Sequence, residues 1–154
     1  MTAPTGTGIR SSIWGFLAEA ESLTGAANPG LLGLSDDPRV YPHGAPADSV
    51  FPYVVFKRAD RPEQRTLAAT RGLRSATFDF EVWGDDAVVV EQVVEALRAR
   101  LESSHSKRGS VSVRSVTLEG EVDDAVRPED GSEVTWFVTI LTARFAYIES
   151  SAGA

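Results

Sequence analysis

The sequence predicts an α+β domain in which a mostly antiparallel sheet of four strands, or slightly more, carries two main helices on one face. Three observations lead to this expectation. Residues 85–103 repeat apolar side chains at helical spacing. Residues 73–83 alternate apolar and polar side chains as a strand does, and residues 134–148 form a second, longer strand pattern.

The length of 154 residues fits one domain. We expect a flexible leader at residues 1–8, the domain at residues 9–149 and a flexible tail at residues 150–154. The first residues hold neither a charged region nor an apolar run, so they do not resemble a secretory signal. The chain has no cysteine, which excludes disulfides, thiolate catalysis and cysteine zinc sites.

The first predicted helix covers residues 9–23. Ser11 or Ser12 is a suitable N-cap, and Gly25 is a suitable end. Trp14 lies off the apolar stripe and indicates a second contact surface. The stripe is formed by Ile9, Ile13, Phe16, Leu17 and Ala20.

Loops and strands alternate in the middle of the chain. Residues 25–50 are expected to form a proline-rich loop, and so long a loop is typically functional or packed on a neighbour. A short strand at residues 51–58 begins near Pro52, since proline is confined to strand ends and sheet edges. A basic loop at residues 59–72 leads to the strand at residues 73–83. Its core face carries Phe78, Phe80 and Val82.

The helix at residues 85–103 has the clearest signals at both ends. Asp85 and Asp86 stand at its N-terminus, and Arg98 and Arg100 stand near its C-terminus, so both pairs complement the helix dipole. Its apolar stripe is formed by Val90, Val93, Val94, Leu97 and Leu101.

Two strands and an acidic loop are predicted to complete the domain. Residues 111–119 form a strand whose apolar parity shifts, and a β-bulge near Arg114 and Ser115 explains the shift. The acidic stretch from Asp123 to Gly131 is expected to be a long hairpin loop. The strand at residues 134–148 is apolar on both faces. One face carries Phe137, Leu141, Phe145 and Tyr147, and the other carries Trp136, Val138 and Ile140.

The second apolar face of the strand at residues 134–148 must be buried by other residues. A strand that is apolar on both faces is buried either inside its own domain or by a partner. Two helices are too few to cover both faces of a four-stranded sheet. We therefore expect a neighbouring subunit near part of the face that carries Trp136, Val138 and Ile140.

No residue pattern indicates catalysis, a cofactor or a metal. His43 and His105 each stand alone in a polar segment, and no motif supplies an oriented partner. The acidic pair Asp85 and Asp86 is explained as helix capping, and the loop from Asp123 to Glu133 lacks the spacing of a calcium loop. The glycines form no phosphate loop. We therefore predict a protein that is not an enzyme and that binds no cofactor.

Charge is segregated along the chain, which carries a net charge of −7. The segment from Lys57 to Arg74, here called the basic run, has six basic residues against two acidic ones. The segment from Glu119 to Glu133 has seven acidic residues against one arginine. Three interpretations of the basic run stay open: a solvated loop, a contact with the acidic segment of a neighbouring subunit, or a contact with DNA. A net-negative chain is a poor candidate for a tight nucleic-acid binder.

Three sequence pieces occur in a characteristic order. They are Val40-Tyr41-Pro42 with Ala45-Pro46, then Phe51-Pro52-Tyr53-Val54-Val55-Phe56, then Phe78-Asp79-Phe80-Glu81-Val82-Trp83-Gly84 running into a helix. This order resembles the tail-completion and tail-terminator proteins of long-tailed bacteriophages and prophages, of the lambda minor tail type. The resemblance covers roughly residues 9–101 and, more loosely, the final strands.

The resemblance implies a structural virion protein with an α+β fold. Such proteins form rings, usually hexamers, at the head-proximal end of the tail tube, where they stop tube polymerisation and meet the head connector. The implied partners are other copies of the chain, the tail tube protein and the head–tail connector or stopper protein. Genomic DNA would pass through the channel without specific binding, no membrane would be involved, and assembly would take place in the host cytoplasm.

Cyclic rings use a heterologous interface, in which two different surfaces of one chain meet. We therefore expect the basic run to contact the acidic segment of a neighbouring subunit, the tube or the connector. The candidate interface residues are Arg61, Arg65, Arg71, Asp123, Asp124, Glu129, Asp130, Trp136, Val138 and Ile140. The alternatives are a head-side connector or stopper, and a small ligand-binding module or enzyme with a pocket around Tyr41, His43 and Trp83.

Overall fold

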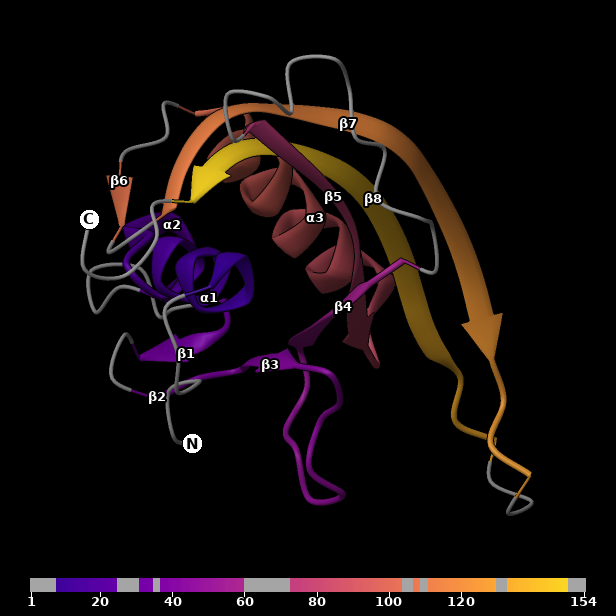
Figure 1. The fold of residues 1–154 in the computed structure, drawn as a ribbon. Helices are drawn as coiled ribbons and strands as arrows, with labels where there is room; N and C mark the ends of the chain where they lie inside the picture. Colours follow the sequence, from indigo (N-terminus) through magenta and orange to yellow (C-terminus); the bar gives the residue numbers. More distant parts are fainter. Residues whose placement is uncertain are drawn as a thin grey trace.

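A computed structural model describes residues 8–24, 31–34, 37–59, 73–103, 107–108, 111–129 and 133–149. Its main sheet has the strand order β3-β4-β5-β8-β7-β6, and β1 and β2 form a separate small pair (Figure 1). The strands are β1 (Gly33–Leu34), β2 (Asp37–Pro38), β3 (Val40–Pro42), β4 (Tyr53–Arg58), β5 (Leu73–Gly84), β6 (Lys107–Arg108), β7 (Val111–Val126) and β8 (Trp136–Glu149). The helices are α1 (Ile9–Ala18), α2 (Glu21–Thr24) and α3 (Ala87–Glu102).

The main sheet is antiparallel except at one edge, where β3 runs parallel to β4. Strand β5 pairs with β8 without interruption from Leu73 opposite Ile148 to Gly84 opposite Phe137. Strand β7 then pairs with β8 along most of its length, and the two strands form an arch in Figure 1. The predicted α+β class and the mostly antiparallel sheet are confirmed.

Helix α3 forms because its apolar residues recur at helical spacing and its start is capped. All five residues of the predicted stripe are buried, from Val90 to Leu101. The carboxylate of Asp86 accepts a hydrogen bond from the backbone N–H of Val88 at 2.9 Å, which satisfies one of the N–H groups left free at a helix start. Asp86 is therefore the N-cap, while Asp85 lies outside the helix.

The predicted helix at residues 9–23 is instead two helices. Helix α1 ends at Ala18, and α2 begins at Glu21. The Thr24 hydroxyl donates to the carbonyls of Ala18 and Ala20, at 2.5 and 3.2 Å, and so satisfies groups that the break exposes. The predicted serine caps are also wrong, because Gly8 is the N-cap of α1 and no side chain caps it. The expected end at Gly25 lies outside the described residues.

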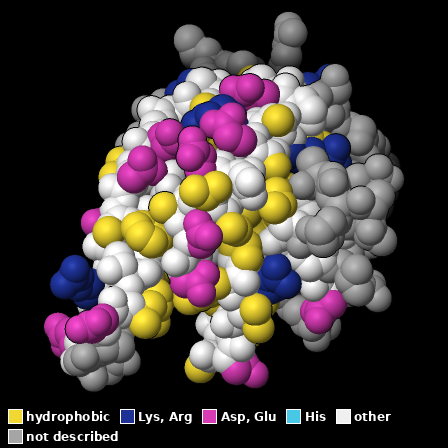
Figure 2. All heavy atoms as spheres, turned by 180° about the vertical axis from the view of Figure 1, so that it is seen from behind, with side chains coloured by type: hydrophobic (Ala, Val, Ile, Leu, Met, Phe, Trp, Pro, Cys, Tyr) yellow, Lys and Arg dark blue, Asp and Glu magenta, His cyan; other side chains and the backbone are white. Residues whose placement is uncertain are grey.

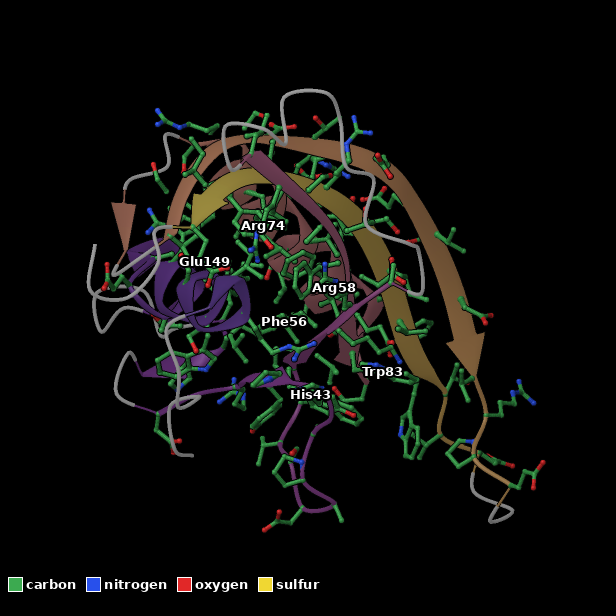
Figure 3. The ribbon with its side chains drawn as sticks, in the orientation of Figure 1. His43, Phe56, Arg58, Arg74, Trp83 and Glu149 are labelled. Atoms are coloured by element: carbon green, nitrogen blue, oxygen red, sulfur yellow. The ribbon has the colours of Figure 1, made fainter. Side chains whose placement is uncertain are left out.

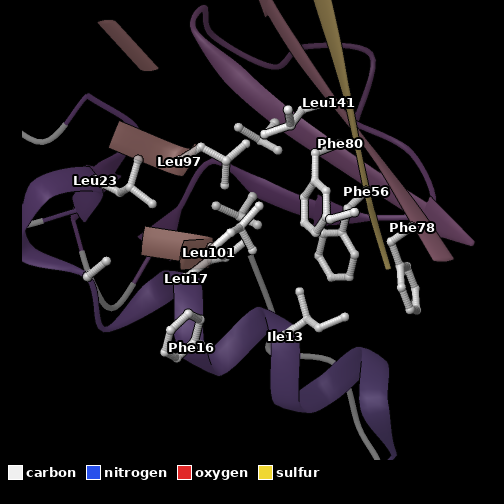
Figure 4. Close-up of a cluster of buried hydrophobic side chains, with 14 of the residues drawn as sticks. Ile13, Phe16, Leu17, Leu23, Phe56, Phe78, Phe80, Leu97, Leu101 and Leu141 are labelled. Carbon is white, nitrogen blue, oxygen red and sulfur yellow. The ribbon is translucent and has the colours of Figure 1, made fainter. Parts of the chain in front are cut away.

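One hydrophobic core lies between the helices and the sheet. Figure 4 shows aromatic side chains of β4 and β5 facing aliphatic side chains of α1 and α3. Phe56 stacks on Phe80 with ring centroids 5.8 Å apart, and Phe78 meets Phe145 edge-on at 5.9 Å. Arg100 of α3 lies 3.8 Å over the ring of Phe16, and its Nε donates to the Phe16 carbonyl, so this arginine joins α3 to α1.

The expected loop at residues 25–50 contains three short strands. The sequence pattern missed them because they are two or three residues long and include prolines. Arg39 orders this region: its side chain donates to the carbonyls of Pro52 and Leu31, at 2.8 and 3.0 Å. Trp14 donates from Nε1 to the carbonyl of Val40 at 3.1 Å, which is the second contact expected for it.

Strand β7 is longer than predicted. The register shifts between Val113 and Ser115, which confirms the bulge expected there, and it shifts again between Leu118 and Gly120. Pairing then continues to Val126 opposite Trp136. The first part of the expected acidic hairpin loop, Asp123 to Val126, is therefore strand. The sequence pattern did not predict this part of the strand, because its residues are mostly acidic. Exposed strands lack the apolar alternation by which buried strands are recognised.

Gly84 permits the close approach of α3 to the end of β5. A Cβ atom built on Gly84 would lie 2.6 Å from Val90 Cγ2, and a β-branched helix side chain has little freedom to move away. We expect Gly84→Ala to lower the free energy of unfolding by about 1–3 kcal/mol, as overpacked core substitutions do. Urea unfolding measures the change. Gly120→Ala is the control, because nothing lies within 4 Å of that Cβ, and equal effects of the two changes would contradict the packing account.

Asp86→Ala removes the N-cap hydrogen bond of α3 and should cost about 1 kcal/mol of stability. Asp85→Ala leaves that hydrogen bond in place and removes only a nearby negative charge, so its effect should be smaller. Thermal unfolding of both variants separates the two contributions. An equal loss in both would show that the charge, and not the cap, matters.

Candidate functional site

The β7–β8 hairpin runs past α3, and its described end, residues 126–129 and 133–136, extends beyond the helices in Figure 1. Side chains of β7 from Glu119 to Ala125 are all exposed, on both faces of the strand. Thr139 donates from its hydroxyl to Asp123 across the two strands at 2.7 Å. The hairpin is therefore an ordered ribbon with little of its own core.

A groove lies between α3 and this hairpin, with a volume of about 390 Å³. The helix and the hairpin contribute equally to its walls. Small and aliphatic residues of α3 and Phe137 of β8 form its apolar part, and carboxylates stand along it. The lining residues are Ala87, Val90, Glu91, Val94, Glu95, Arg98, Glu121, Asp123, Asp124, Phe137, Val138 and Thr139.

The groove is strongly acidic. Five of its lining residues carry carboxylates, all of them exposed, and one, Arg98, is basic. Arg98 pairs with Glu95 at 2.8 Å and also with Glu121, so it ties the helix to the hairpin. Within the described residues, neither Glu91 nor Asp123 has an ion-pair partner, and the Asp123 carboxylate accepts from the Thr139 hydroxyl. The groove thus keeps unneutralised negative charge.

Figure 2 shows the molecule from behind, where acidic side chains gather around exposed hydrophobic ones and basic side chains are few and scattered. The exposed hydrophobic residues of the described chain include Val88, 61% exposed, and Val122, 63% exposed. Apolar and acidic groups therefore share one surface.

The opposite face of the sheet is partly covered by the chain itself. Val138 is buried, and Trp136 meets the ring of Phe51 edge-on at 5.8 Å. Phe51 stacks on Tyr53 at 5.4 Å. Trp136 and Ile140 stay half-buried, so the face expected to need a neighbouring subunit is smaller than the sequence indicates.

Polar side chains continue this outer face. Lys57 Nζ lies 2.6 Å from Glu81 Oε2, and Trp83 Nε1 donates to Glu81 at 3.1 Å. Burial, followed by the negative charge of Glu81, raises the pKa of Tyr53 above its ordinary value of 10.0. The Tyr53 hydroxyl therefore stays protonated at neutral pH.

The structure brings together only some of the predicted interface residues. Asp123 and Asp124 both line the groove, while Glu129 is exposed near the hairpin turn and lines no part of it. Arg61, Arg65, Arg71 and Asp130 lie outside the described residues. The ends of the basic run are described: Arg58 ends β4, and Arg74 in β5 pairs with Glu149 at 3.3 Å (Figure 3).

Two cavities of the described chain do not include the residues suggested for a small-molecule pocket. Tyr41 and Trp83 lie on either side of Tyr53 on the outer face, and His43 is exposed. Neither the groove nor a second cavity of about 240 Å³, at Leu73 to Ser75 and Arg144, is lined by Tyr41, His43 or Trp83.

His105 lies outside the described residues. The described part of the chain holds no group of three His, Asp or Glu residues placed to bind a metal, and none of its helices is long and apolar enough to cross a membrane.

Sequence reasoning missed the helix side of the groove. Glu91, Glu95 and Arg98 recur at intervals of four and three residues, which places them along one side of α3. This spacing is visible in the sequence, but charged residues at such intervals are also typical of an ordinary solvated helix face. Only the three-dimensional pairing of Arg98 with Glu121 shows that this side faces the hairpin.

The chain was compared with known proteins at the levels of sequence and structure. No family model matches the sequence, and no curated protein matches it. Among solved structures, it is similar to a chain of the virion of a native gene transfer agent particle, with a TM-score of 0.52 and 15% identity. The match covers 90% of this chain and 94% of the other. The fold resembles that of a virion chain.

Arg98→Met removes the ion pair with Glu121, which joins α3 to the hairpin, and the pair with Glu95, which lies within α3. Since surface ion pairs contribute little, the free energy of unfolding should change by less than about 1 kcal/mol. Amide hydrogen exchange in residues 119–126 should nevertheless become faster, because the hairpin loses its tie to the helix. Arg127→Met, which changes an arginine near the hairpin turn, is the control. Unchanged exchange in the Arg98 variant would contradict the role of this tie.

Proposed function

We propose that this protein is a structural component of a phage-like particle that forms a ring at the head-proximal end of the tail tube. The observation that carries the proposal is the fold similarity to a gene transfer agent virion chain across nearly the full length of both chains. The ordered sequence pieces at Val40–Pro46, Phe51–Phe56 and Phe78–Gly84 support the tail-terminator role in particular. The ring is proposed to be a hexamer, as the family resemblance implies.

Two features of the structure support ring assembly. The acidic groove and the basic run come from different segments of one chain, as a heterologous interface requires. The hairpin extends beyond the helices and offers a surface to a neighbouring subunit or a tube end. Opposite charges on the two surfaces would steer the copies into one register.

The proposed partners are further copies of the chain, the tail tube protein and the head–tail connector. The ring would end tube polymerisation on one side and present its other side to the connector. A chain with a net charge of −7 would line a channel through which DNA slides without sticking. Tight, salt-sensitive binding of DNA to the assembled ring would contradict this part of the proposal.

A second candidate is a head-side connector or stopper protein. The matched solved structure is a whole particle, so the fold similarity supports a virion role without distinguishing tail from head. Antibody labelling of separated heads and tails distinguishes the two candidates. Label on tail ends supports the terminator, and label on tail-free heads supports the stopper.

The terminator role is tested by adding the purified chain to polymerising tail tube protein from the same particle. We expect tubes to stop growing and to carry one ring-shaped density at one end, as seen by negative-stain electron microscopy. The same protein added after polymerisation is the control, which should bind tube ends without shortening the tubes. Tubes of unchanged length and bare ends would contradict the proposal.

A further inference from the structure

We propose that the groove between α3 and the β7–β8 hairpin is the docking site for the basic run of a second copy of this chain. This inference rests on the proposed ring and names the surfaces that join its subunits. The contact lies along the side of α3, where Glu91 and Glu95 stand, as well as on the hairpin. It does not include the hairpin turn near Glu129.

The charge of the groove indicates that a basic segment binds in it. Of the five exposed acidic residues that line the groove, four turn their carboxylates to it, because Asp124 lies opposite Val138 on the other face of the sheet. One guanidinium opposes them, and it already pairs with Glu95 and Glu121. The basic run carries six basic residues against two acidic ones. Arginine is suited to this surface, because its planar fork binds carboxylates through paired hydrogen bonds and its stem packs on apolar side chains. Val90, Val94 and Phe137 supply the apolar part of the groove.

A small molecule fits the groove less well than a basic segment does. Small-molecule pockets are mostly apolar, with a few convergent polar groups. This groove is instead lined by exposed carboxylates, spread along both its helix wall and its hairpin wall. Such an extended charged lining matches an extended chain with several cationic side chains.

Lys57 and Arg74, at the two ends of the basic run, pair away from the groove of the same molecule. Lys57, the first residue of the run, pairs with Glu81 on the outer face of the sheet, whereas the groove lies on the helix face. Arg74, at the other end of the run, pairs with Glu149. Strands β5 and β8 separate β4 from β7 in the sheet. Glu91 has no ion pair with the rest of the described chain, so the charge stays available to another copy.

A charge exchange between two variants tests the docking. The groove variant is Glu91→Lys with Asp123→Lys, neither of which breaks an ion pair of the described chain. The run variant is Arg61→Glu with Arg65→Glu and Arg71→Glu, which leaves three basic residues against five acidic ones in the run. Each variant alone brings like charges together in the contact, so its half-assembly concentration should rise at least about tenfold. An equimolar mixture should assemble again, because each groove then meets a run of opposite charge.

Light scattering on a sizing column measures the mass of each sample. The matched control is Glu129→Lys with Glu133→Lys, which changes the net charge by the same amount at the hairpin turn and should leave assembly unchanged. If this control disrupts assembly as strongly as the groove variant does, or if the mixture fails to assemble, the docking inference is wrong.

The same experiment separates the docking inference from the proposed function. If the wild-type chain forms no ring in solution or on tube ends, the terminator proposal fails. The docking inference is still decided in that case, because direct binding of the groove variant to the run variant requires only two copies. Surface-immobilised groove variant should bind the run variant at least about tenfold more tightly than it binds a second copy of itself. Equal binding overturns the inference, and normal rings from the groove variant overturn it while the terminator proposal stands.

Discussion

The structure depends on the packing of two helices against one face of a curved sheet. The apolar stripe of α3 and the side chains of α1 bury the aromatic residues of β4, β5 and β8. This packing has a length limit, because a helix of 16 residues spans about 24 Å while a strand of 16 residues spans about 53 Å. Strands β7 and β8 therefore extend past the helix that covers them. The projecting hairpin and the groove beside α3 are consequences of this mismatch.

The charges around the groove contribute little to the fold itself. Exposed ion pairs add at most about 1 kcal/mol each, and a cluster of like charges lowers stability. Arg98 offsets part of the repulsion by holding Glu95 and Glu121, but Glu91 and Asp123 stay without a basic partner in the described chain. The assembly between copies that we propose would give the segregation of acidic and basic residues a role. In that setting opposite charges select one register and exclude the contact of like surfaces.

The sequence predicts the core well and the surfaces poorly. The stripe from Val90 to Leu101 and the alternation of Phe78, Phe80 and Val82 were recognised because burial imposes a period on apolar residues. The bulge near Arg114 was recognised for the same reason. The break after Ala18 was not, since it depends on hydrogen bonds from the Thr24 hydroxyl. The helix wall of the groove could not be predicted either, because Glu91 and Glu95 face the hairpin only once β7 has paired along β8.

The account is tested most directly by the mass of the purified chain, measured by light scattering on a sizing column over a range of concentrations, with the peak imaged by negative stain. The account predicts closed rings with one copy number and a central hole, formed in solution or on the ends of tail tubes. A monomer at every concentration that also leaves tube ends bare would contradict it.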